Sequence, residues 1–376
     1  MPDPKTGHVR RDLWLDILRA LAVIGVIGTH LKLPVNLLPR LLEAPLRLWK
    51  QGGWVGVDLF FVLSGFLVSG LLFKELIGNG TVSVGRFLVR RGFKIYPPFW
   101  LVLSGIIAAR LILHSPISAA NVIGEVLFLQ NYVGKLSGTH WTLAIEEHFY
   151  LLLAFWFWLQ MRGKVLSKKE ILRRFRYYPL IYFIAALICL MFRLAYINSP
   201  NYSQAIFMTH LRIDALLFGS LLSWFWHLDG MKLINFRYQH RVLFTVIGII
   251  FLLPPFILDE NNRGWAFQLF CFNGFYFGSG LLILAGYGLE IKGSLYKLVS
   301  LIGSCSYGIY LCHDPLQRYF LFWIFDLESS CLMWYLYFVS YLGGSCIIGI
   351  WLTRLVERPS LILRDRLFPS NVGRCY

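Results

Sequence analysis

Long apolar stretches recur along the chain, separated by short polar or basic segments. A helix needs about 20 apolar residues to cross the hydrocarbon core of a bilayer, because each residue adds about 1.5 Å of length. About ten stretches meet this requirement, and the pattern predicts a membrane helix over each of them: 13–31, 52–73, 95–113, 141–160, 178–197, 204–226, 242–258, 265–288, 298–320 and 332–353. The chain is therefore predicted to be an all-α integral membrane protein, with residues 1–376 forming a single domain.

Two apolar segments are open to a second interpretation. Residues 13–31 follow a basic start, but Lys32, Leu33 and Pro34 stand where a signal peptide would have small residues, so we expect a retained first helix. Residues 121–133 are apolar but short. A full span there would place the basic loop 161–177 on the outer face, so we interpret 121–133 as re-entrant or interfacial.

Composition and charge agree with a membrane protein. Only 15% of the 376 residues are charged, against about 25% in soluble domains. The net charge is +16, and most of the 36 Lys and Arg residues fall in connecting segments on one side when the N-terminus is placed inside the cell. This bias predicts cytoplasmic termini and a multi-pass protein of the plasma (inner) membrane. Since the charge is explained by topology, no nucleic acid partner is expected.

The seven cysteines are scattered, mostly inside predicted helices, and none has the spacing of metal ligands. Neither a disulfide framework nor a metal site is therefore predicted. No internal repeat is visible, so the sequence gives no support to an inverted-repeat transporter.

Ionisable residues interrupt the outer halves of several predicted helices. Such residues are costly in hydrocarbon and usually mark a protein-lined site or a water-filled cavity. Helix direction and rise place them at similar depth, so we expect one shared polar cavity near the outer face. The residues concerned are His30, Asp58, Glu146, Glu147, His210, Arg212, Asp214, His313 and Asp314.

Structural roles are also open for these residues. His30 could be an interfacial histidine with a backbone partner, and Asp58 could form a structural ion pair with Arg212. Glu146 and Glu147 are adjacent, so one of them is expected to face the cavity while the other reaches toward the interface.

A basic cluster opens the third helix from the cytoplasmic side. It contains Arg90, Arg91 and Lys94, and the spacing of three puts Arg91 and Lys94 on one helical face. A topological anchor is one interpretation. The other is a phosphate-binding site, because Arg forms bidentate contacts with phosphate and Lys supplies a point charge. Asp16 and Arg19 have the same spacing and are expected to pair within the first helix.

Seven sequence blocks, in this order, resemble the membrane acyltransferase-3 family, the integral-membrane O-acyltransferases of surface glycans. The blocks are DILRALA (16–22) with His30, GWVGVDLFFVLSGF (53–66), RRGFKIYP (90–97), WTLAIEEHFY (141–150), RIDALLFG (212–219), GSCSYGIYLCHDP (303–315) and ERP (357–359). The resemblance implies a ten-helix fold that takes an acyl group, usually acetyl, from cytoplasmic acyl-CoA. It also implies a carbohydrate hydroxyl outside the cytoplasm as the acceptor.

The resemblance also implies roles for individual residues. His30 matches the family's essential histidine, Asp58 the aspartate of the glycine-rich helix, and Glu146 the first acid of the Trp-x-Leu-x-x-Glu block. Arg91 and Lys94 match the basic pair, although the family commonly has Arg where this chain has Lys94. Members that modify peptidoglycan carry an added soluble SGNH domain; this chain shows none, so we expect direct transfer or transfer to another protein.

Residue chemistry and resemblance lead to one mechanistic hypothesis. His30 takes the acceptor's hydroxyl proton, Asp58 or Glu146 orients it, and Arg212 stabilises the oxyanion. Acyl-CoA is bound by the basic cluster, and no metal is needed. The alternative is a transporter or flippase of a glycan or lipid-linked sugar, which would also account for buried charges. A non-catalytic scaffold or receptor is the third possibility.

Overall fold

The computed structural model describes residues 12–35, 38–197, 199, 206–228, 230–258, 265–289 and 293–369, without the side chains of 230–235, 265, 266, 268, 294 and 295. Every regular element in this part of the chain is helical, which confirms the predicted all-α class. The elements α1 to α8 are α1 (Leu13–Thr29), α2 (Arg40–Gly52), α3 (Val55–Asn79), α4 (Val84–Ile112), α5 (Ala119–Val126), α6 (Trp141–Met161), α7 (Lys168–Arg174) and α8 (Tyr178–Tyr196). The later elements are α10 (Thr209–Arg212), α11 (Asp214–Leu228), α12 (Gly230–Leu252), α13 (Pro254–Ile257), α14 (Trp265–Gly286), α15 (Ser294–Ser304), α16 (Ser306–Leu316), η2 (Gln317–Leu321), α17 (Phe322–Ile324), α18 (Cys331–Leu352), η3 (Thr353–Glu357) and α19 (Arg358–Leu367).

Within the described part of the chain, five helical segments are long and apolar enough to cross a membrane, so the chain has the character of a membrane protein. They are Val55–Asn79, Val84–Ile112, Lys168–Tyr196, Leu269–Gly286 and Cys331–Leu367. The predicted total of about ten spans and the cytoplasmic placement of the termini stay predictions.

Several predicted spans are interrupted. The span 298–320 divides at Cys305 into α15 and α16, and a π-helical turn, η2, follows. Pro315 lacks a backbone N–H and so leaves a carbonyl of the preceding turn without its helical partner, a condition that favours such irregular turns. The span 242–258 ends at Leu252, next to Pro254 and Pro255. The span 204–226 begins among residues outside the described part, and within that part it divides into α10 and α11.

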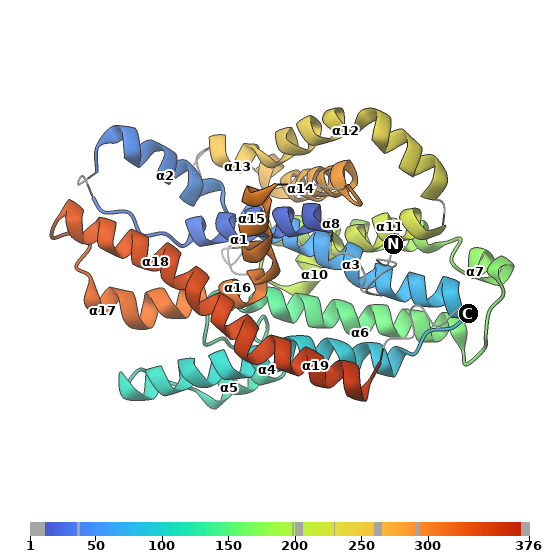
Figure 1. Cartoon of the computed structure of the whole chain (residues 1–376), viewed down its shortest axis with the longest axis horizontal. Coiled ribbons are helices and arrows are strands. Elements are labelled where there is room, and N and C mark those ends of the chain that lie inside the picture. Colours follow the sequence, from blue (N-terminus) through green and yellow to red (C-terminus); the bar gives the residue numbers. More distant parts are fainter. Residues whose placement is uncertain are drawn as a thin grey trace.

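The short apolar segment before α6 does not form a membrane-crossing helix. Its helix, α5, has eight residues, and turns follow it up to Trp141. In Figure 1, α5 lies at the same end of the molecule as α2 and α17, whereas α7 and the end of α19 lie at the opposite end. This arrangement agrees with the expectation that α5 and the basic loop around α7 face different sides.

Glycine allows a very close and extensive helix contact between α3 and α11. A Cβ placed on Gly65 would lie 2.0 Å from the carbonyl oxygen of Leu216, and one on Gly219 would lie 2.2 Å from that of Val62. Both distances are far inside van der Waals contact. Without an inward driving force from water, membrane helices rely on such close approach.

Two buried ion pairs lie in the same region. Arg212 binds Asp58, which ties α10 to α3, and Arg193 binds Asp214, which ties α8 to α11. All four side chains are almost completely buried. The structure thus confirms the ion pair that the sequence left open for Asp58. The predicted pair of Asp16 and Arg19 also forms, at 2.8 Å.

The glycine contact makes a direct prediction. Gly65→Ala should lower the melting temperature of the detergent-purified protein by an amount corresponding to about 1–3 kcal/mol, because the added methyl has no space. Gly105→Ala, on α4, is the matched control, since nothing lies within 4 Å of its Cβ position. That control should be neutral or stabilising by up to about 1 kcal/mol. Equal melting temperatures for the two variants would contradict the close packing of α3 and α11.

Candidate functional site

A cavity of about 320 Å³ lies among α3, α4, α6 and α16. This volume is within the range of small-molecule sites, about 300–1,000 Å³. Apolar residues such as Phe60 and Leu67 form much of its wall. The polar side chains that line it are Arg19, Ser64, Arg91, Lys94, Thr142, Glu146, Tyr150, Ser306, Tyr307 and Tyr310. We call it the basic cavity.

Arg91 and Lys94 are the distinctive groups of the basic cavity. The Arg91 guanidinium lies over the rings of Tyr150 and Phe87, at 5.7 and 6.0 Å from their centroids. Within the described residues, neither Arg91 nor Lys94 makes a hydrogen bond or an ion pair. Half-buried cations without a protein acceptor create a site for an anion.

Glu146 faces the same cavity and is held by two hydroxyl groups. The Tyr150 hydroxyl donates to Glu146 Oε2 at 2.8 Å, and Ser64 Oγ lies 2.8 Å from the same hydroxyl. Because Tyr150 uses its proton on Glu146, Ser64 is the donor in the second bond. Its neighbour Glu147 points elsewhere and accepts from the Tyr96 hydroxyl at 3.0 Å. Of the two adjacent acids, Glu146 is therefore the one that lines the cavity.

Arg90 was grouped with Arg91 and Lys94 from its sequence position, but it contacts a different helix. Its guanidinium forms an ion pair with Asp365 at 2.9 Å and donates to the carbonyl oxygen of Phe368. Arg90 is absent from the lining of the basic cavity. Its contacts tie α4 to α19.

His30 lines a second cavity, of about 350 Å³. Its polar lining consists of Thr29, His30, Lys32, Lys50, Asp314, Gln317 and Arg318. We call it the histidine cavity. Its cations outnumber its single carboxylate, Asp314, which pairs with Arg318 at 3.3 Å.

The expectation of one shared outer cavity is wrong. His30 and Glu146 line different cavities, and Asp58 and Arg212 line neither of the two. The depth of a residue along its helix does not determine toward which neighbouring helix its side chain points. The side chains of His30 and Glu146 point into different cavities.

Asp58 and Arg212 lie behind the wall of the basic cavity. The Arg212 guanidinium is 4.1 Å from the ring centroid of Phe272, 5.6 Å from that of Trp141 and 6.0 Å from that of Phe61. Phe61 itself lines the basic cavity. The ion pair is therefore enclosed by aromatic rings and supports the cavity wall.

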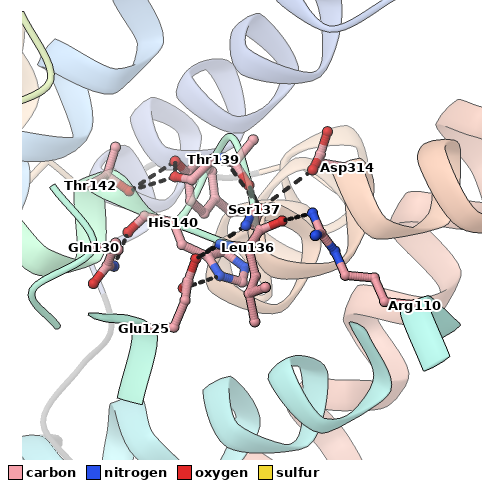
Figure 2. Close-up of polar contacts among 10 residues, drawn as sticks. Arg110, Glu125, Gln130, Leu136, Ser137, Thr139, His140, Thr142 and Asp314 are labelled. Carbon is pink, nitrogen blue, oxygen red and sulfur yellow. Dashed lines mark hydrogen bonds and ion pairs between the residues drawn. The ribbon is translucent and has the colours of Figure 1, made fainter. Parts of the chain in front are cut away.

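The segment before α6 is folded against the bundle by a buried acid–histidine pair (Figure 2). His140 Nδ1 donates to Glu125 Oε2 at 2.9 Å, and both side chains are fully buried. Glu125 Oε1 accepts the backbone N–H groups of Leu136 and Ser137, at 2.9 and 3.1 Å. Gln130 donates to the carbonyl oxygen of His140 at 2.7 Å.

The same segment contacts residues of both cavities. The Tyr310 hydroxyl donates to the carbonyl oxygen of Thr139 at 2.6 Å and accepts from Thr142 at 2.8 Å. Ser137 Oγ donates to Asp314 at 3.4 Å, as Figure 2 shows. The Glu125–His140 pair therefore positions a wall shared by the two cavities. Sequence reasoning missed this pair; its signal was a lone acid inside an otherwise apolar short stretch.

The pKa of Glu125 lies below its ordinary value. Burial alone would raise it, but the hydrogen bond and charge of His140 and the backbone donors of Ser137 and Leu136 outweigh burial. The ionised carboxylate is thus the form that the fold stabilises.

Comparison with known families identifies the class. The family model described as an acyltransferase domain, of the acyltransferase-3 family, matches residues 12–354. The chain therefore belongs to the acyltransferase-3 family. The resemblance inferred from the seven sequence blocks is confirmed.

Two relatives show the kind of acyltransferase to which the chain is similar. Peptidoglycan O-acetyltransferase OatA of Listeria monocytogenes is 27% identical over 339 residues, covering 80% of this chain and 49% of the relative. O-acetyltransferase OatA of Staphylococcus aureus is 28% identical over 331 residues, covering 80% and 50%. The chain spans about half the length of these curated relatives. No solved structure matches it.

The Glu125 contacts predict a pH-dependent stability effect. Because the folded pKa lies below the unfolded one, the carboxylate contributes stability near neutral pH that is lost as the pH falls through its folded value. Glu125→Gln should therefore destabilise the protein by about 2–4 kcal/mol near pH 7. The difference in melting temperature from the unmodified protein should shrink as the pH is lowered.

Glu43→Gln is the control for this prediction, because Glu43 pairs with the exposed Arg47 on α2. Such a surface pair contributes at most about 1 kcal/mol. A Glu125→Gln protein as stable as this control at pH 7 would contradict the role of the buried pair.

Proposed function

We propose that the protein transfers an acetyl group from cytoplasmic acetyl-CoA to a hydroxyl of an extracytoplasmic carbohydrate. The observation that supports the proposal is that two different sets of polar groups line two separate cavities. Arg91 and Lys94 line the basic cavity, and His30 lines the histidine cavity on the far side of the wall that contains Tyr310. A donor with phosphates and an acceptor with a hydroxyl require these two kinds of site.

The basic cavity suits the donor. Its lining carries Arg91 and Lys94 against a single acid, Glu146, while the third cation, Arg19, is paired with Asp16, so an anion is attracted. Arg91 offers bidentate donors to a phosphate group, and Lys94 adds a point charge. The apolar wall formed by Phe60 and Leu67 suits the uncharged arm that carries the thioester. Arg90 supports this site from α19 through its contact with Asp365.

His30 suits the role of general base. An imidazole has a pKa near operating pH and can take the proton of an attacking hydroxyl. The hydroxyl oxygen then bonds to the thioester carbon, the carbon–sulfur bond breaks, and the thiolate receives the proton to leave as the CoA thiol. Glu146 acts within the basic cavity, through Tyr150 and Ser64, while Asp58 and Arg212 keep its wall in place.

The acceptor proposal follows the names of the relatives, one of which is a peptidoglycan O-acetyltransferase. We propose a cell-envelope glycan as the acceptor and the plasma membrane as the location. The cations Lys32, Lys50 and Arg318 at the histidine cavity favour a polar, hydrated acceptor over an apolar one.

Donor binding tests the basic cavity. Arg91→Gln and Lys94→Gln should each weaken binding of radiolabelled acetyl-CoA to the purified protein by about 10- to 100-fold, since each removes a charge-assisted contact. Arg162→Gln, at an exposed position after α6, is the charge-matched control and should bind normally. If the protein bound no acetyl-CoA, or if Arg91→Gln left acetyl-CoA binding unchanged, the result would favour the alternative function, a glycan transporter.

Acyl transfer tests His30. His30→Ala should abolish the appearance of alkali-labile acetate on cell-envelope glycans, measured by mass spectrometry, while acetyl-CoA binding is retained. His210→Ala, which removes a contact with the Tyr132 hydroxyl and ring packing against Tyr132, Phe192 and Tyr196, should keep transfer. Normal glycan acetylation by the His30→Ala protein would rule out a general-base role.

A further inference from the structure

A second histidine lies directly behind His30. His313, on α16, is fully buried, and the centroid of its ring is 5.2 Å from that of His30. One turn earlier on the same helix, Tyr310 lines the basic cavity, and the next residue, Asp314, lines the histidine cavity. His313 therefore lies in the wall between the two cavities.

One hydrogen bond settles the tautomer of His313. Its Nδ1 is 2.6 Å from the carbonyl oxygen of Tyr310, and a carbonyl oxygen only accepts, so Nδ1 carries the hydrogen. In a neutral imidazole Nε2 then carries the lone pair. This atom is buried and has no hydrogen-bond partner among the described residues. A buried acceptor without a donor calls for a functional explanation.

His30 is within reach as that donor. Two imidazoles joined by an N–H···N hydrogen bond have centroids about 5 Å apart, because the two nitrogens are about 3 Å apart. The observed 5.2 Å is close to this value, with the rings tilted by 51°. His30 borders a cavity, so its ring has room to rotate into the hydrogen bond.

The segment that follows His313 along the chain also contacts the backbone of His30. Gln317 Nε2, in the π-helical turn that follows α16, donates to the carbonyl oxygen of His30 at 2.8 Å. The same amide donates to the Tyr337 hydroxyl at 2.6 Å. Asp314, by contrast, is engaged by Ser137 and Arg318. His313 Nε2 is therefore the acceptor beside His30 that has no donor among the described residues.

We propose that His313 positions His30 by accepting a hydrogen bond from one of its ring N–H groups. The lone pair of His30 then resides on its other ring nitrogen, directed to the histidine cavity, where the acceptor hydroxyl binds. This inference rests on the proposed function, in which His30 is the base. When His30 takes the hydroxyl proton, the bond to His313 stabilises the imidazolium. When the thiolate takes that proton, His30 returns to the same tautomer.

Two substitutions test the roles of the two ring nitrogens of His313 separately. In His313→Asn the amide N–H replaces Nδ1 at the Tyr310 carbonyl, but nothing replaces Nε2. In His313→Gln the amide reaches the position of Nε2 and can accept a hydrogen bond. Inverted membrane vesicles with the full chain and native acceptors would be supplied with radiolabelled acetyl-CoA. His313→Asn should lower kcat by about 100-fold or more with donor KM and binding unchanged. His313→Gln should restore a large part of kcat.

His227 provides a matched control. Its Nδ1 donates to the carbonyl oxygen of Ser223 at 2.8 Å, and its Nε2 is buried without a partner among the described residues. It packs on Phe73, however, rather than beside His30. His227→Asn should therefore leave kcat unchanged.

Each other outcome overturns the inference. Wild-type kcat in His313→Asn, equal loss of kcat in both His313 variants, or loss of donor binding in His313→Asn would show that Nε2 does not position the base. In these cases acyl transfer by the unmodified protein would still support the proposed function. Vesicles with the unmodified protein that neither bind nor consume acetyl-CoA would refute both.

Discussion

The cost of an unpaired charge in hydrocarbon governs the arrangement of this protein. Arg193 and Arg212 are buried in the bundle, and each is bound to an aspartate and lies over the ring of Phe272. Arg91 and Lys94 have no such acceptor in the described part of the chain, and they line a cavity. Hydrocarbon tolerates the first arrangement because the charges are paired, and the second because a cavity admits water or an anion. The same constraint therefore separates the paired arginines of the bundle from the cavity-lining cations Arg91 and Lys94.

Close helix packing makes this separation possible. Gly65 and Gly219 let α3 and α11 approach until backbone meets backbone, which leaves the Asp58–Arg212 pair enclosed on one side of α3. The other side of α3 contributes Phe60, Ser64 and Leu67 to the basic cavity. One side of α3 thus carries the ion pair, and the other side lines the basic cavity. The sequence block 53–66 contains both sets of residues, which explains why its glycines and its aspartate occur together.

Irregular helix geometry has a comparable role on the other side of the wall. Pro315 precedes a π-helical turn, and that turn brings Gln317 to the backbone of His30. Tyr310, His313 and Asp314 come from the regular part of the same helix. Irregular turns of this kind occur frequently at functional sites because they redirect side chains without ending the helix. The Glu125–His140 pair completes the wall from the opposite side through Thr139 and Ser137.

Apolar periodicity and length were sufficient to predict an all-helical membrane protein, and the sequence blocks were sufficient to predict its family, because both signals are local along the chain. Local spacing also predicted the Asp16–Arg19 pair and the shared face of Arg91 and Lys94. Tertiary structure alone decided that Arg90 binds Asp365, that His30 and Glu146 line different cavities, and that His313 lies beside His30. A sequence gives the depth of a residue along its helix through the fixed rise per residue. The direction in which its side chain points depends on how neighbouring helices pack, and that packing joins residues hundreds of positions apart.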